Sequence, residues 1–191
     1  DKPLIFYPLS ILMLAGIKNI LIIVNKGQLN QFKKILPENN NLGIKISYIE
    51  QSKPSGLPDA FIIGKKFIAN DKVALILGDN FFYAQNFSSK LKKCAKLKKG
   101  AQVFLHPVKK PQLYGVASIN SKNKVLSIVE KPKKPRSNLA VTGMYFFDNK
   151  VVEYSKKLKP SKRKELEIVD LLNIYKRKNK LNAEFIGRGA A

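Results

Sequence analysis

The chain is poor in the residues that build disulfides, metal clusters and nucleophilic triads. Its 191 residues include one cysteine, Cys94, one histidine, His106, and no tryptophan. A single thiol cannot form a disulfide within the chain, and one histidine with one cysteine cannot supply a zinc-type cluster. These shortages exclude a disulfide framework and a His/Cys metal centre within the chain, and the single thiol fits a reducing compartment.

A long hydrophobic run is also missing. The longest candidate covers residues 4–17, LIFYPLSILMLAGI, and is interrupted by Pro8 and Ser10. A bilayer-spanning helix needs about 20 consecutive apolar residues. A signal peptide would begin with a more basic segment than one lysine against one aspartate. We therefore expect a buried core helix starting near Pro8, no membrane partner, and a cytoplasmic protein.

Acidic residues are scarce relative to basic ones. The chain has 36 Lys and Arg against 13 Asp and Glu, a net charge of +23. Such an excess is typical of a nucleic-acid-binding module. Only four basic residues are arginine, however, the side chain whose fork matches phosphate and guanine. The lysines are spread along the whole chain without a recognition motif. A lysine-rich background is therefore the favoured interpretation and no nucleic-acid partner is expected, with a basic nucleic-acid-binding module as the less favoured alternative.

Apolar segments of strand length alternate with segments of helical spacing in the first half of the chain. This alternation predicts an α/β fold with a mostly parallel sheet covered by helices on both faces. No linker or internal repeat divides the sequence, so a single domain over residues 1–191 is expected. The expected strands are 19–25, 44–50, 73–77 and 101–107, and the expected helices are 8–15, 29–36, 57–69 and 87–99.

The second half has a different pattern. Residues 114–132 alternate apolar and polar side chains around a turn at 121–124, which is typical of a β-hairpin. Strands are also expected at 140–147 and 181–186, and helices at 151–158 and 165–178.

The stretch VALILGDNFFY, residues 73–83, places a carboxylate at the end of a buried strand. Ligands bind beyond the carboxyl ends of strands in open parallel sheets, and an ionised carboxylate near a buried strand end needs a cation or amide partners. Asp79 could therefore bind Mg²⁺ on a phosphate, with Gly78 allowing the backbone to approach a ligand closely. Asp79 could equally cap the following turn, and these residues alone leave both interpretations open.

Two other loops carry candidate binding groups. Residues 50–60, EQSKPSGLPDA, join a strand to a helix through a tight turn at Gly56, and a helix N-terminus attracts anions. Glu130 and Lys131 end another predicted strand, where the carboxylate could accept sugar hydroxyls and the ammonium could meet a phosphate. A common strand-to-helix loop and a surface ion pair are the simpler interpretations of these segments.

Seven segments, taken together, resemble the sugar-1-phosphate nucleotidylyltransferases. They occur in that family's order and spacing, and they cover essentially all 191 residues. Within the family, the chain is most similar to the bacterial enzymes that use dTTP and glucose-1-phosphate. The segments are DKPLIFYPLSILMLAGIKNILII, QSKPSGLPDAFIIG, LGDNFFY, YGVASI, VEKPKKPRSNLAVTGMYFFDN, LKPSKRKELEIVD and GRGAA.

The resemblance implies a fold and a reaction. The fold is the nucleotide-diphospho-sugar transferase fold, a Rossmann-like three-layer sandwich with a mostly parallel central sheet. In the reaction, the sugar-1-phosphate attacks the α-phosphorus of the nucleoside triphosphate with Mg²⁺ assistance, and pyrophosphate leaves. Such a transfer depends on positioning and charge neutralisation more than on a protein nucleophile, which fits a chain without a histidine-activated nucleophile.

The resemblance also implies site residues and partners. By motif, Asp79 is the metal ligand, and Gln51, Gly56 and Leu57 contact the base. The family makes dTDP-glucose for nucleotide-sugar biosynthesis, including the dTDP-rhamnose pathway, and commonly forms homo-oligomers. The residues implied for the sugar-phosphate pocket are Tyr114, Gly115, Glu130, Lys131, Val141, Tyr145 and Arg163.

Parts of the family's domain would lie beyond both ends of this sequence. The family's glycine-rich phosphate loop and catalytic lysine precede the segment DKP, so the catalytic residues are expected upstream of Asp1. The second metal-binding aspartate follows GRGAA, beyond Ala191. We therefore expect an incomplete domain, truncated at both ends, that is inactive alone and has an unpaired central sheet edge. A non-catalytic nucleotide-sugar-binding or regulatory homologue remains the alternative.

Overall fold

The structure of the chain is a computed structural model that describes residues 2–122 and 124–186. The segment GRGAA, quoted above for the family resemblance, lies outside the described residues, as does Asp1. The strands are β1 (Asn19–Asn25), β2 (Lys45–Gln51), β3 (Val73–Ile76), β4 (Ala101–Pro107), β5 (Gly115–Ile119), β6 (Val125–Glu130), β7 (Leu139–Phe147) and β8 (Leu181–Phe185). The helices are α1 (Phe6–Leu14), α2 (Leu29–Ile35), α3 (Asp59–Ile63), α4 (Lys65–Ile68), α5 (Phe87–Ala95), α6 (Val151–Lys156) and α7 (Ile168–Arg177), with a 3₁₀ turn at Pro111–Leu113.

The order and type of these elements agree with the sequence pattern, and two predicted helices differ in extent. The predicted helix 57–69 is divided at Gly64 into α3 and α4, because glycine weakens a helix interior. The predicted helix 165–178 begins only with α7. The residues before it form a turn in which Lys164 has a φ of 62°, a left-handed conformation that cannot continue a right-handed helix.

The strands form a mixed sheet rather than a mostly parallel one. The larger sheet has the order β6-β5-β7-β4-β8, with β3 also paired to β7, and β1 and β2 form a separate parallel pair. Strands β4 and β8 are parallel, whereas β7 runs antiparallel to β3, β4 and β5. The α/β class is therefore confirmed, but the expectation of a mostly parallel sheet is corrected. A strand buried on both faces has the same apolar pattern in either direction, so the sequence could not indicate that β7 enters reversed between β3 and β4.

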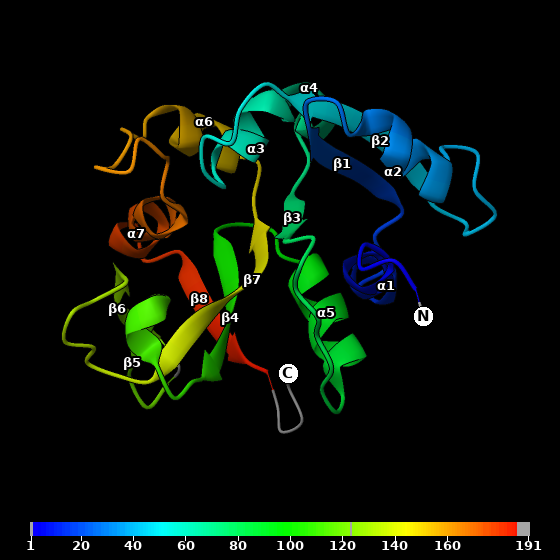
Figure 1. Cartoon of the computed structure of the whole chain (residues 1–191). Coiled ribbons are helices and arrows are strands. Elements are labelled where there is room, and N and C mark those ends of the chain that lie inside the picture. Colours follow the sequence, from blue (N-terminus) through cyan, green and yellow to red (C-terminus); the bar gives the residue numbers. More distant parts are fainter. Residues whose placement is uncertain (1, 123, 187–191) are drawn as a thin grey trace.

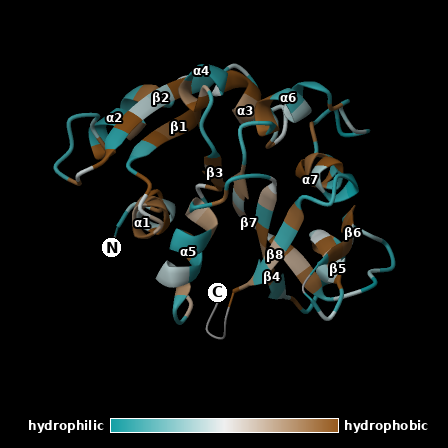
Figure 2. Ribbon diagram, turned by 180° about the vertical axis from the view of Figure 1, so that it is seen from behind, coloured by the Kyte–Doolittle hydropathy of each residue, from teal (hydrophilic) through white to brown (hydrophobic). Residues whose placement is uncertain are grey.

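Helices cover both faces of the larger sheet, which gives the expected three-layer sandwich (Figure 1). Successive β7 side chains point to opposite faces: Tyr145 and Phe147 pack with α6 and α7, and Met144 and Phe146 pack with α5 and α1. Helix α1, the predicted core helix, also packs on β1 through Leu9 and its neighbours. Figure 2 shows the hydrophobic residues along α1, β1 and the strands of the larger sheet. None of the described helices is long and apolar enough to cross a membrane.

Two strand edges face each other across the middle of the molecule. In the described part of the chain, β1 pairs only with β2, and β3 pairs only with β7. Between them lie two cavities. One is lined by Asn19, Lys45 and Val73 at the beginnings of β1, β2 and β3, and the other by residues at their carboxyl ends, including Gln51 and Gly78. The three strands therefore run in the same direction, and β1 and β3 each have one edge without a strand partner among the described residues.

Candidate functional site

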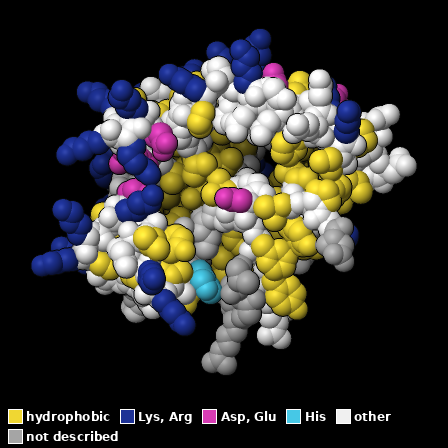
Figure 3. All heavy atoms as spheres, in the orientation of Figure 1, with side chains coloured by type: hydrophobic (Ala, Val, Ile, Leu, Met, Phe, Trp, Pro, Cys, Tyr) yellow, Lys and Arg dark blue, Asp and Glu magenta, His cyan; other side chains and the backbone are white. Residues whose placement is uncertain are grey.

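The cavity at the carboxyl ends of β1, β2 and β3 brings together residues that the sequence analysis took from different segments. It has a volume of about 490 Å³. Figure 3 shows this face hollowed, with a hydrophobic floor and with acidic and basic side chains gathered on one side. Five of the predicted binding residues are among those that line it: Gln51, Gly56, Leu57, Glu130 and Arg163.

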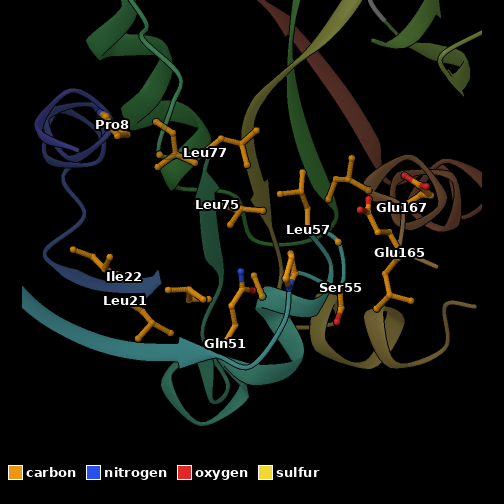
Figure 4. A pocket seen from close by; sticks show the side chains of 18 of the residues that line it. Pro8, Leu21, Ile22, Gln51, Ser55, Leu57, Leu75, Leu77, Glu165 and Glu167 are labelled. Atoms are coloured by element: carbon orange, nitrogen blue, oxygen red, sulfur yellow. The ribbon is translucent and has the colours of Figure 1, made fainter. Parts of the chain in front are cut away.

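One wall of the cavity is made by two loops in direct backbone contact. The Leu166 N–H donates to the Ser55 carbonyl oxygen over 2.8 Å. Gly56 has a φ of +96°, and a Cβ there would lie 2.1 Å from the Leu166 carbonyl oxygen. Only glycine permits this conformation and approach together. Figure 4 shows Ser55 and Leu57 beside the segment that carries Glu165 and Glu167. The predicted nucleotide loop is therefore held against the loop that precedes α7.

A charged cluster lies on the second of these loops. The Arg163 guanidinium makes two hydrogen bonds to Glu167, from Nη2 to Oε2 over 2.7 Å and from Nε to Oε1 over 3.2 Å. The Ser161 hydroxyl donates to Glu167 Oε1 over 2.6 Å. Arg163 Nη2 also lies 3.8 Å from Glu130 Oε1, at the end of β6. Arginine is thus placed between two carboxylates at the edge of the cavity.

The two carboxylates have opposite pKa shifts. Burial raises the pKa of Glu130, and repulsion from Glu167 raises it further, against the opposing effects of Lys131 and Arg163. Burial also acts to raise the pKa of Glu167, but the hydrogen bonds from Arg163 and Ser161 outweigh it, so the pKa of Glu167 is lowered. Glu167 is therefore the carboxylate that binds Arg163. Glu130, beside the cavity, is the carboxylate whose negative charge is less well compensated by hydrogen bonds and cations.

Sequence reasoning missed Glu167. Its signal was present in LKPSKRKELEIVD, where a glutamate stands four residues after Arg163, in the first turn of the predicted helix 165–178. The structure places it directly before α7. A residue at that place ends the loop and begins the helix, so its backbone is fixed on both sides. A hydrogen bond between side chains across a tight turn depends on the turn's shape, which local patterns do not encode.

Other residues predicted for the sugar phosphate lie next to Glu130. Gly115 is paired with Glu130 across β5 and β6, and a Cβ on Gly115 would lie 3.3 Å from Glu130 Oε2 and 3.9 Å from the Val141 Cβ. The Lys131 N–H donates to the Tyr114 carbonyl oxygen over 3.0 Å. Tyr114, Gly115, Lys131 and Val141 are thus grouped around one strand end, although they are not among the residues that line the cavity.

Tyr145 lies in the core rather than on the cavity surface. Its side chain is 3% exposed, and its ring stacks on Phe147 with centroids 6.2 Å apart. Burial raises the pKa of its hydroxyl, and the nearby Glu130 charge raises it further. Tyr145 lies close enough to Glu130 for that charge to affect its pKa, but it is not among the residues that line the cavity.

Asp79 lies on the loop after β3, at the mouth of the same region. The neighbouring Gly78 lines the cavity, whereas Asp79 is exposed and is not among the lining residues. The Asn80 amide donates to Asp79 Oδ1 over 2.8 Å and accepts from the Gly143 N–H over 3.2 Å. Asn80, which sequence reasoning passed over, therefore ties the loop to β7. The signal was the glycine inside β7, a residue that often marks a close approach.

The charged and polar groups at this site do not form a preassembled metal cluster. Among the described residues, no group of three or more His, Cys, Asp and Glu side chains could hold a metal ion. Asp79 contributes one exposed carboxylate, a hard oxygen donor of the kind that Mg²⁺ accepts. The arrangement suits an ion that brings most of its other ligands with it.

The chain is 50% identical over 191 residues to a glucose-1-phosphate thymidylyltransferase of Neisseria meningitidis, covering 100% of the chain and 66% of that protein. It is 45% identical to a glucose-1-phosphate thymidylyltransferase of Xanthomonas campestris, covering 65% of that protein. The chain thus spans about two thirds of the length of the curated relatives that it matches.

Solved structures show the same fold. The structure matches a Bacillus anthracis protein described as a glucose-1-phosphate thymidylyltransferase, solved with sucrose, with a TM-score of 0.87 and 36% identity over 97% of this chain and 74% of that one. It also matches a UDP-glucose pyrophosphorylase solved with UDP-glucose, with a TM-score of 0.84 and 26% identity over 100% of this chain and 80% of that one. The family model described as Nucleotidyl transferase matches residues 1–191. The chain therefore belongs to the nucleotidyl transferase family.

Proposed function

We propose that this protein transfers a nucleotidyl group from dTTP to glucose-1-phosphate, forming dTDP-glucose and pyrophosphate. The observation that carries the proposal is the single cavity lined by Gln51, Gly56, Leu57, Glu130 and Arg163. Similarity to proteins named for this reaction supports it. Because the chain covers about two thirds of those relatives, the proposal concerns a polypeptide of their length.

The proposed reaction exchanges one phosphoanhydride bond for another. A phosphate oxygen of glucose-1-phosphate forms a bond to the α-phosphorus, and the bond from that phosphorus to the pyrophosphate oxygen breaks. Both reactants are anionic, so the site must neutralise charge and hold the two groups in line. We assign Arg163, which lies at the edge of the cavity, to the sugar phosphate. Glu130, the less satisfied carboxylate, is assigned to the sugar hydroxyls.

The nucleotide is assigned to the loop after β2. The Gln51 amide nitrogen donates to Asn25 Oδ1 over 2.9 Å, which orients the side chain and leaves its amide oxygen for a base. Gly56 brings the backbone close to the cavity, and Leu57 supplies an apolar surface on which a planar base can lie. Tyr114, Gly115, Lys131, Val141 and Tyr145 remain proposed members of the sugar-phosphate side through their grouping around Glu130.

A magnesium ion is the proposed cofactor, with Asp79 as its ligand from this chain. Mg²⁺ commonly reaches such sites bound to substrate phosphates and takes one or two protein carboxylates. When bound, it would neutralise charge on the triphosphate. The side chain of Asn80 holds the Asp79 carboxylate on the loop after β3, so Asp79 would meet the ion in a restrained position. We also propose a cytoplasmic homo-oligomer that supplies dTDP-glucose to the dTDP-rhamnose pathway.

The test is pyrophosphate release, measured on a polypeptide of the relatives' length that contains these residues. With dTTP and Mg²⁺, glucose-1-phosphate should give dTDP-glucose, and Lys131→Ala should weaken use of glucose-1-phosphate far more than use of dTTP. UTP and other sugar-1-phosphates serve as competitor substrates. Binding of dTDP-glucose without turnover would favour a non-catalytic homologue, and the absence of both would overturn the proposal.

A further inference from the structure

Arg163 is held in place by a residue that the proposed function does not otherwise use. Its side chain is 48% exposed, and a long, exposed arginine loses rotamer freedom when it is fixed in one geometry. Glu167 is 12% exposed and directly precedes α7, where its backbone oxygen accepts from the Asp170 N–H over 3.1 Å. The more rigid partner of this pair is therefore the glutamate.

The hydrogen bonds between them fix the guanidinium plane while leaving part of it unused. A guanidinium carries five N–H groups, and Glu167 takes one from Nε and one from Nη2. The Ser161 hydroxyl donates to the same carboxylate over 2.6 Å, and the Arg163 N–H donates to the Ser161 hydroxyl oxygen over 3.2 Å. The turn thus orients the carboxylate, and the carboxylate orients the arginine.

Without Glu167, Arg163 has a second carboxylate within reach. Its Nη2 forms a long ion pair with Glu130 Oε1 over 3.8 Å, beyond hydrogen-bonding distance but close enough to become a hydrogen-bonded pair after a small movement. Such a pairing would occupy the carboxylate that is assigned to sugar hydroxyls and turn the guanidinium away from a phosphate. The present arrangement keeps Arg163 and Glu130 in a long ion pair without a hydrogen bond between them.

We propose that Glu167 is a positioning residue that holds the Arg163 guanidinium at the cavity edge, ready for a phosphate, and prevents it from hydrogen bonding to Glu130. The proposal takes the identity of the phosphate, that of glucose-1-phosphate, from the proposed function. It makes the pair Arg163–Glu167, rather than the arginine alone, the unit that recognises the sugar phosphate.

A double-mutant cycle tests the proposal on the longer polypeptide. Glu167→Gln should raise the KM for glucose-1-phosphate about tenfold, with little change in the KM for dTTP. This increase is at the lower end of the range expected for the loss of a charge-assisted hydrogen bond. In an Arg163→Ala background the same change should have almost no further effect. Glu153→Gln is the matched control, because Glu153 forms a comparable i,i+4 ion pair with Lys157 on α6, is not among the residues that line the cavity, and should leave the KM unchanged. Equal, additive losses in both backgrounds would overturn the proposal.

A second measurement does not depend on activity. In the 191-residue chain, ¹³C NMR can follow the titration of the Glu130 carboxyl group. Glu167→Gln removes a like charge and frees Arg163 to approach, so the pKa of Glu130 should fall, and Glu167→Gln combined with Arg163→Ala should reverse part of that fall. An unchanged Glu130 titration would overturn the proposal. If the longer polypeptide uses no sugar-1-phosphate while this titration behaves as expected, the proposed function fails but the positioning role stands.

Discussion

The two sides of the cavity are built in different ways. On one side, the loop around Gly56 and the turn before α7 touch through their backbones, and the Arg163–Glu167 pair joins the same wall. On the other side, β1 and β3 face each other with one unpaired edge each in the described part of the chain. The charged groups proposed to recognise the sugar phosphate thus lie on the closed side, whereas the open side offers apolar side chains and unpaired backbone. The groups proposed to bind the sugar phosphate are therefore held in place where two loops contact each other.

The largest effect is expected from opening the closed side at Gly56. Gly56→Ala places a Cβ 2.1 Å from the Leu166 carbonyl oxygen and also strains a φ of +96°, so it should lower the free energy of unfolding by about 3 kcal/mol. Gly27→Ala is the control, because Gly27 has a φ of +86° but nothing within 4 Å of the added Cβ. It should cost only about 1 kcal/mol. Urea unfolding measures both, and equal costs would show that the loop contact does not restrain this wall.

A smaller effect is expected where the loop after β3 is tied to β7. Gly143→Ala places a Cβ 2.4 Å from Asn80 Oδ1 and 2.7 Å from a Leu77 methyl carbon. Asn80 must move, so we expect a loss of about 2 kcal/mol together with weaker Mg²⁺-dependent nucleotide binding. In Gly78→Ala the added Cβ meets nothing within 4 Å, and its stability should change by less than about 0.5 kcal/mol. If both variants unfold at the same urea concentration, Asn80 is not the anchor of this loop.

On the open side, self-association should respond to an added charge rather than to a change in side-chain volume. An unpaired strand edge invites pairing with another chain, and a lysine on it opposes that pairing. Ile23 on β1 lines both central cavities, so Ile23→Lys should reduce self-association of the 191-residue chain in light scattering. Ile35→Lys on α2 is the control, since Ile35 is a surface residue that is 45% exposed. A similar reduction in the control would assign self-association to general surface hydrophobicity.

The smallest expected effect is the pH dependence of the folding stability contributed by the carboxylates on the closed side. The raised pKa of Glu130 means that its charged form is disfavoured by folding, so stability is lost as pH rises through its folded-state pKa. Glu130→Gln should therefore stabilise the chain above pH 4.5, the unperturbed value, by less than about 1 kcal/mol, with no gain well below it. Glu167 has the opposite sign, because its lowered pKa gives stability that is lost as pH falls. Urea midpoints at several pH values for both Gln variants check these signs, and parallel shifts would contradict them.

Part of the candidate site could be predicted from strand ends, as for Asp79 and Glu130, whereas the roles of Gln51, Gly56, Leu57 and Arg163 were implied by the family resemblance. Gln51 and Glu130 end β2 and β6, and Gly56 shapes the loop between a strand and a helix. Apolar periodicity locates such ends well. Tyr145, which the motif places in the sugar-phosphate pocket, is buried in β7 beside Phe147, and its proposed role there remains a prediction. The side of a sheet to which a residue points depends on the strand's neighbours.

The sequence by itself determined the order and type of the strands and helices, the α/β class, and the segments that carry the family's motifs. These follow from local periodicity, glycine and proline placement, and residue identity, which act over a few residues. Tertiary structure alone decided the reversed direction of β7, the facing edges of β1 and β3, and the position of Glu130 beside the Arg163–Glu167 pair. Each of these depends on which distant segments become neighbours, and burial on both faces produces the same apolar pattern whichever neighbours are chosen.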